Sequence, residues 1–244
     1  MASVRQNVLV DFAELRAQVE SLRVAGRTPK QIARALGVTP AVVAPIIREI
    51  AADQIGTEPT GSALIGCWIS PGWSAGLGLG GCPTTWSDGG SGDGLVLVAV
   101  AREHRHGKVR VCGFLVDTFC LGLKNTIGPK IMEPAKVDAF LRDYFVGYGG
   151  NYGPTPVELA QEIVLGAVEY ARKLGFEPDS GFAETSSLLG DWTPPSRIEF
   201  GCNGRPYFQQ GPYDNATQIM RTLDKSVGRG KYEFTVVSAG RSEW

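Results

Sequence analysis

The 244-residue chain contains no apolar run long enough to cross a bilayer, and its first residues lack the apolar core of a signal peptide. We therefore expect a cytoplasmic protein with no membrane partner. An excess of charge of one sign is also missing, since 24 Lys and Arg residues face 25 Asp and Glu residues, which gives a net charge of −1. The chain as a whole therefore has no electrostatic bias toward nucleic acids or other polyanions.

Patterns typical of metal and cofactor binding are missing as well. The two histidines, His104 and His106, are too few for a zinc site without thiolates, and no two cysteines have a Cys-x-x-Cys spacing. The nine glycines between residues 71 and 94 match neither the Walker phosphate loop nor the dinucleotide fingerprint. We expect no metal, no cofactor and no disulfide framework, so free thiols are predicted for all five cysteines: Cys67, Cys82, Cys112, Cys120 and Cys202.

What the sequence does contain is a segment typical of a helix-turn-helix, residues 29–48. Gly37 lies where the tight turn is expected, and Ala33 is small enough for two helices to cross closely. Start signals precede the second and third helices, at Thr28-Pro29 and at Thr39-Pro40, and a first helix is expected over residues 11–24. The predicted trihelical core consists of Ile32, Leu36, Val38, Val43 and Ile46.

Residues 11–52 resemble the helix-turn-helix superfamily, which includes bacterial repressors, site-specific recombinases and sigma factors. The resemblance implies DNA as a partner. In this motif the third helix enters the major groove with its first residues, but Ala41, Val42 and Pro45 offer no hydrogen-bonding groups to base edges. A trihelical unit used for dimerisation or docking is therefore an alternative. Polar residues on the turn and helices are the candidate nucleic-acid-binding residues: Arg27, Lys30, Gln31, Arg34, Thr39 and Arg48.

The sequence predicts an α+β fold made of two domains. A trihelical helix-turn-helix domain is expected at residues 1–53, a linker rich in turn-forming residues at 54–62, and a larger domain with antiparallel strands and several helices at 63–244. Strands at 64–69, 95–102 and 109–119 suggest an antiparallel meander, and a second hairpin is expected at 197–209 around Asn203-Gly204. The remaining elements are predicted to be helices at 134–145, 155–174 and 215–227, and a strand at 232–237.

The glycine-rich segment 71–94 is expected to be a flexible surface loop. Trp68, Trp73 and Trp86 lie in it or beside it. If these aromatic side chains are exposed, they offer a surface for stacking or for a partner protein.

Candidate catalytic residues occur where a predicted apolar strand runs into a polar end. Asp117 and Lys124 could act there as a base or metal ligand and as a cation that stabilises a developing anion, a combination used in nucleic-acid hydrolysis. Glu199 and Asp214 are candidates for a second acidic group. The structural alternative is that Asp117 and Lys124 pair at a strand end while Cys120 packs inside.

Residues 64–237 resemble uncharacterised bacterial proteins in phrases such as Ile198-Glu-Phe-Gly201, and this resemblance implies no activity. The leading hypothesis is a DNA-binding protein, regulatory or recruiting, whose α+β domain senses, oligomerises or docks. One alternative is a nucleic-acid-processing hydrolase recruited by the helix-turn-helix, so whether the protein is an enzyme stays open. A structural assembly protein is the other alternative, and a homo-oligomer is compatible with each of them.

Overall fold

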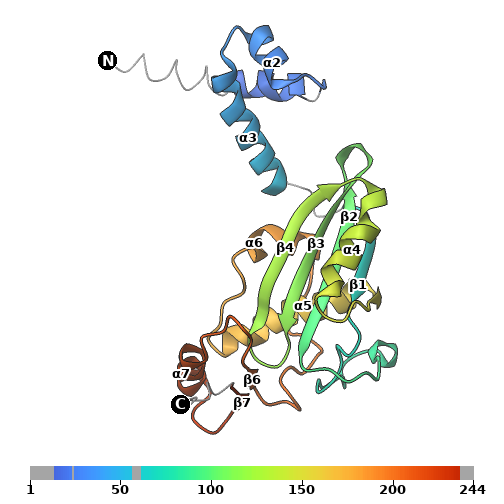
Figure 1. Cartoon of the computed structure of the whole chain (residues 1–244), viewed down its shortest axis with the longest axis vertical. Helices are drawn as coiled ribbons and strands as arrows, with labels where there is room; N and C mark the ends of the chain where they lie inside the picture. Colours follow the sequence, from blue (N-terminus) through green and yellow to red (C-terminus); the bar gives the residue numbers. More distant parts are fainter. Residues whose placement is uncertain (1–13, 24, 57–61, 237–244) are drawn as a thin grey trace, which may run out of the picture. The chain divides into compact units, whose positions relative to one another are not determined.

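The computed structural model describes residues 14–23, 25–56 and 62–236. The chain divides into two compact units, Met1–Pro59 and Thr60–Trp244, which are described separately. The fold is α+β, as predicted: consecutive helices form the first unit, and an antiparallel sheet with helices forms the second (Figure 1). Within the described residues, no helix is both long and apolar enough to span a membrane.

The N-terminal unit contains a helix over residues 14–23, α2 (Pro29–Leu36) and α3 (Pro40–Gly56). The other residues of the predicted first helix, 11–13 and 24, lie outside the described part. Thr28 caps α2 in a capping box with Gln31, and Gly37 ends it with a φ of 66°, a conformation that glycine adopts without strain. The apolar side chains of the three helices meet in one core, whose fully buried members are Val19, Ile32, Ala33, Val43, Ile46 and Ile50.

The α3 helix is longer than expected, because it continues to Gly56 and so takes in the first residues of the segment predicted as a linker. Ala51, Ala52 and Gln54 have high helix propensity, which outweighs the turn-forming residues that follow. Pro45 lies inside this helix with its side chain exposed. Residues 57–61 lie outside the described part.

A five-stranded antiparallel sheet forms the centre of the larger unit, in the order β4-β3-β2-β1-β5. The predicted meander is confirmed by β1 (Leu64–Ile69), β2 (Leu95–His104) and β3 (Lys108–Asp117), which pair in chain order. The sequence did not predict β4 (Gly122–Met132), whose glycines, Asn125 and Pro129 are typical of turns. These residues are tolerated because β4 is an edge strand with one neighbour. The other edge is the two-residue β5 (Gly153–Pro154).

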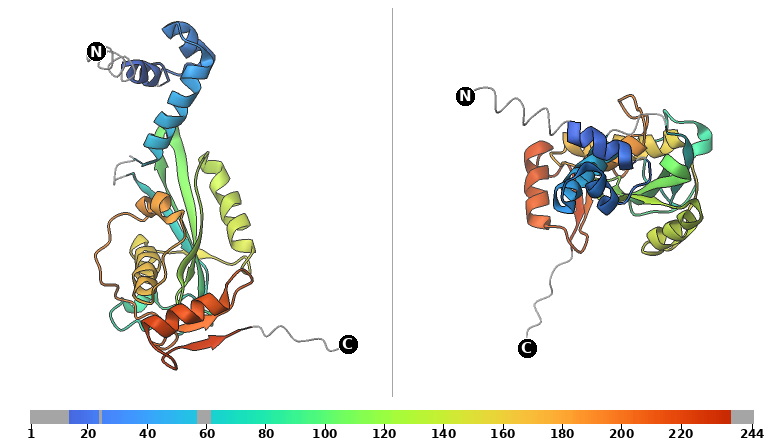
Figure 2. Two further views of the ribbon diagram at one scale, coloured as in Figure 1. Left: turned by 90° about the vertical axis from the view of Figure 1, so that its left-hand side faces the viewer. Right: turned by 90° about the horizontal axis from the view of Figure 1, so that it is seen from above.

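Both faces of this sheet are covered by helices. Alternate residues of β2, from Val96 to Val100, pack with α5 (Val157–Lys173) on one face. The residues between them, from Leu97 to Ala101, pack with α4 (Val137–Val146) on the other. Figure 2 shows the two helices on opposite sides of the sheet. Burial on both sides explains why β2 is a continuous apolar run rather than an alternating one.

A small two-stranded sheet replaces the second hairpin expected at residues 197–209. The turn at Asn203-Gly204 forms, but β6 (Tyr207–Gln209) pairs in parallel with β7 (Glu233–Thr235), and α7 (Ala216–Ser226) connects them. The hairpin is prevented because both sides of the turn bond elsewhere: the backbone N–H of Gly201 donates to Thr118, and that of Tyr207 donates to Phe119. Shorter helical turns connect the other elements: Thr84–Trp86, Arg105–Gly107, Pro134–Lys136, Phe182–Thr185 (α6) and Ser186–Leu188.

Candidate functional site

Residues 21–48, from the end of the first helix into α3, carry charge of a single sign. Between residues 21 and 48 the sequence contains five basic residues and no acidic residue, although the chain as a whole has a net charge of −1. All five basic side chains are exposed, so they add positive charge to the surface of the N-terminal unit rather than pairing within its core: Arg23, Arg27, Lys30, Arg34 and Arg48. Phosphate groups are the ligands that such exposed basic side chains suit best.

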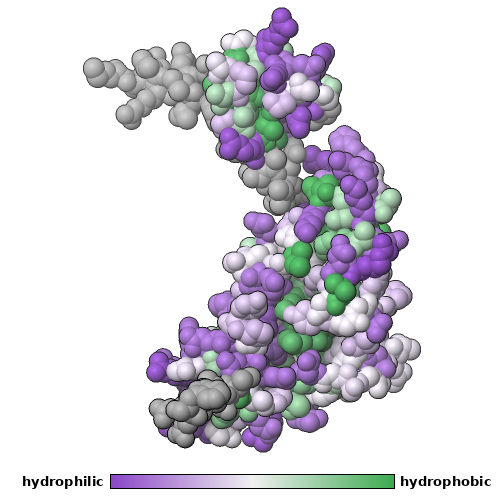
Figure 3. Space-filling model, viewed as in Figure 1, coloured by the Kyte–Doolittle hydropathy of each residue, from purple (hydrophilic) through white to green (hydrophobic). Residues whose placement is uncertain are grey.

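The exposed side chains at the start of α3 are apolar. Ala41, Val42 and Pro45 are exposed there, with Val42 at 42% of its full accessibility. Figure 3 shows green side chains between the purple ones on the visible face of this unit. Small apolar groups can contact thymine methyl groups in a major groove but cannot read the donors and acceptors of base edges.

The other polar candidates of this unit have different surroundings. Gln31 accepts a hydrogen bond from the backbone N–H of Thr28 at 2.9 Å, so its amide serves the helix cap. Arg48 Nε donates to the carbonyl of Ala44 at 3.3 Å, and Thr39 is exposed immediately before α3. Arg27, Lys30 and Arg34 therefore offer the positive charge, whereas Gln31 contributes mainly to the stability of α2.

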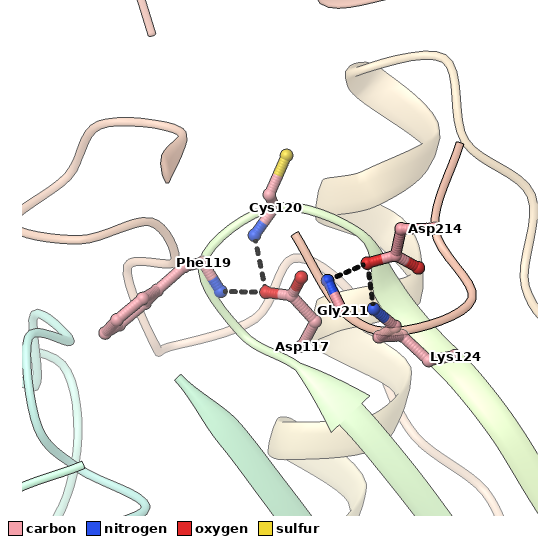
Figure 4. Close-up of polar contacts among 6 residues, drawn as sticks. All are labelled: Asp117, Phe119, Cys120, Lys124, Gly211 and Asp214. Atoms are coloured by element: carbon pink, nitrogen blue, oxygen red, sulfur yellow. Dashed lines mark hydrogen bonds and ion pairs between the residues drawn. The ribbon is translucent and has the colours of Figure 1, made fainter. Parts of the chain in front are cut away.

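Asp117 is buried at the end of β3, with 5% of its surface exposed. Its Oδ1 accepts hydrogen bonds from the backbone N–H groups of Phe119 and Cys120, both at 2.9 Å, which hold the turn between β3 and β4 (Figure 4). Burial raises the pKa of this carboxyl to about 6, although the Cys120 bond and the Lys124 charge act in the opposite direction. These bonds favour a role in the turn over one in chemistry.

Lys124 pairs with Asp214 and not with Asp117. Its Nζ lies 2.7 Å from Asp214 Oδ2, which also accepts the backbone N–H of Gly211 at 2.8 Å (Figure 4). The ion pair joins β4 to the segment before α7. The fold thus brings Asp214 to the candidate cluster, whereas Glu199 bridges to Gly78 elsewhere. Figure 4 shows the Cys120 sulfur pointing away from the Asp117 carboxylate, and burial raises the pKa of the Cys120 thiol.

The tryptophans of the glycine-rich segment do not form an exposed aromatic surface. Trp73 and Trp86 are buried, with 4% and 9% of their surfaces exposed, and Trp68 is half-buried. Asp88 joins two parts of the segment: its carboxylate accepts from the backbone N–H of Gly72 at 2.5 Å and from Ser74 Oγ at 2.6 Å. The glycines thus permit close packing of a folded loop.

The same segment lines a cavity of about 570 Å³ beside the ends of β1 and β5. Sequence reasoning missed this cavity and its acidic residue, Asp88. The signal available was that Asp88 and Asp93 are the only charged residues in the 71–94 segment. Neither Asp117 nor Lys124 lines this cavity. Among the described residues, no group of three or more His, Cys, Asp and Glu side chains is arranged to hold a metal ion.

Comparison with known proteins found no matching family model, no matching curated protein and no matching solved structure.

Proposed function

We propose that this protein binds DNA through its N-terminal trihelical unit and acts as a regulatory or recruiting protein in the cytoplasm. The observation that carries the proposal is the stretch of residues 21–48, whose five charged residues are all basic and all exposed. Phosphate contacts from these side chains supply most of the affinity. The larger unit then serves as the part that is recruited, by sensing, oligomerising or docking.

The apolar start of α3 sets the expected selectivity. Base-edge hydrogen bonds are the main source of sequence discrimination, and Ala41, Val42 and Pro45 can form none with their side chains. Contact with thymine methyl groups gives at most a modest preference for sites rich in A·T pairs. We therefore expect affinity that depends strongly on salt and weakly on sequence.

The test is a fluorescence-anisotropy titration of labelled duplex DNA at several salt concentrations. With roughly three to five phosphate contacts, the logarithm of the binding constant should fall against the logarithm of salt with a slope of about −3 to −4. Arg34→Ala and Lys30→Ala should each weaken binding and reduce the slope by about 1. Lys225→Ala, on the exposed surface of α7, is the matched control and should bind as the unaltered protein does.

The absence of binding at low salt would overturn the proposal, as would binding that Arg34→Ala and Lys30→Ala leave unchanged. Large stable oligomers without DNA affinity would instead support an assembly role. Metal-dependent cleavage of labelled DNA or RNA, abolished by altering Asp117, would support the hydrolase alternative.

A further inference from the structure

Two cavities lie on either side of Ser70 and Pro71, just after β1. The first measures about 570 Å³ and the second about 550 Å³, and both have Ser70 and Pro71 in their walls. Volumes of this size suit small molecules. Neither cavity contains residues of the N-terminal unit, so a ligand here would serve a function distinct from DNA contact.

Aromatic side chains form much of the wall. Trp73, Trp86 and Tyr152 line the first cavity, and Tyr148 lines the second. The Arg197 guanidinium lies over the Trp86 ring, 4.7 Å from its centre, and Arg197 Nε donates to Glu162 at 2.8 Å, which holds both side chains in place. Rigid aromatic faces attract organic cations through the negative charge above the ring.

The charge of the walls has one sign. Asp88 lines the first cavity and Asp93 the second, and the residues that line the two cavities include no Lys, Arg or His, although Arg197 contacts Trp86. The pKa of Asp88 lies below its ordinary value. Partial burial raises this pKa, but the hydrogen bonds from Ser74, Gly90 and Gly72 together lower it by more than burial raises it, so the carboxylate is ionised at neutral pH. Glu158, in the first turn of α5, offsets the positive end of that helix where Pro156 meets the cavity.

We propose that the paired cavities bind an aliphatic diamine or polyamine, with one ammonium group beside Asp88 and the aromatic wall and a second beside Asp93. An ammonium group combines a full positive charge with hydrogen-bond donors, and the alkyl chain between two such groups would contact Ser70 and Pro71, which line both cavities. Carboxylate or phosphate ligands are disfavoured because both aspartates would repel them.

The experiment is calorimetric titration of the full chain at neutral pH with spermidine, butylamine and 1,4-butanediol, accompanied by tryptophan fluorescence. Spermidine should bind more tightly than butylamine, and butanediol should not bind. Asp93→Asn keeps an oxygen that can accept the backbone N–H of Leu95, a bond of 3.1 Å, but removes the charge. It should weaken spermidine binding about ten-fold and leave butylamine binding nearly unchanged.

Asp143→Asn is the matched control, since Asp143 is exposed on α4 and lines neither cavity. Equal binding of spermidine and butanediol would overturn the proposal, and so would the absence of spermidine binding at millimolar concentration. An equal response of Asp93→Asn and Asp143→Asn would overturn it too, because the charge at Asp93 would then have no part in binding.

Discussion

Asp117 shows how a residue type associated with chemistry can serve the fold. Its carboxylate is ionisable and buried, yet the hydrogen-bond acceptor it offers is used by the backbone of the β3–β4 turn. Lys124 Nζ forms an ion pair with Asp214 Oδ2 at 2.7 Å. The aspartates of the paired cavities, Asp88 and Asp93, also accept backbone N–H bonds, but unlike Asp117 they are exposed, as are the basic side chains of the N-terminal unit.

The raised pKa of Asp117 should make the free energy of unfolding depend on pH. Because burial raises that pKa from 3.8 to about 6, the folded state takes up a proton more readily than the unfolded state between these values. The Asp117 contribution therefore disfavours folding above pH 6 and this penalty disappears as the pH falls toward 4.

Asp117→Asn retains an oxygen that can accept both backbone bonds and removes the buried charge. At pH 7 the variant should be more stable than the unaltered protein by roughly 1–3 kcal/mol, and near pH 4 the two should be equal. Urea denaturation at both pH values measures the difference. If the variant were less stable at pH 7, the hydrogen bonds that the charged carboxylate accepts in the turn would outweigh the cost of burying its charge.

The α3 helix contains a conflict between its sequence and its conformation. Pro40 occupies its first position, where the missing N–H has no helical partner, but Pro45 lies in the interior, where proline removes one helical hydrogen bond. Pro45→Ala should therefore stabilise the N-terminal unit by about 1–3 kcal/mol. Pro40→Ala is the control and should change stability little. Melting curves followed by circular dichroism compare both variants with the unaltered protein. Equal curves for Pro45→Ala and the unaltered protein would show that the helix accommodates Pro45 without cost.

At the scale of the whole molecule, the two units should unfold separately. The first has a small core, since its fully buried apolar residues are few, whereas the larger unit buries both faces of a sheet. All five tryptophans follow residue 60, so their fluorescence reports on the larger unit alone. Circular dichroism should show a transition at lower temperature that fluorescence lacks. Coincident transitions by both probes would mean that the units unfold as one.

Local signals in the sequence were sufficient for most helices and for the central strands. Thr28, Pro29 and Gly37 mark the ends of α2 through caps and turns that involve only neighbouring residues. The β2–β3 hairpin is similarly local, because the turn joins two apolar runs directly. The edge strand β4 was missed although it pairs with the neighbouring β3, because its glycines and Pro129 are typical of turns. The parallel pair β6–β7 was missed because its two strands are distant in the chain.

By itself, the sequence determined the α+β class, the order of the central strands and the position of the basic segment, because propensity, periodicity and charge act between near neighbours. Only the tertiary structure decided that Asp117 is enclosed by a turn, that Lys124 meets Asp214 and that Trp73 and Trp86 line a cavity. Residues 124 and 214 are distant in the chain and meet only in the folded protein. The burial of Asp117 and of the two tryptophans is likewise set by the packing of distant elements rather than by residue type.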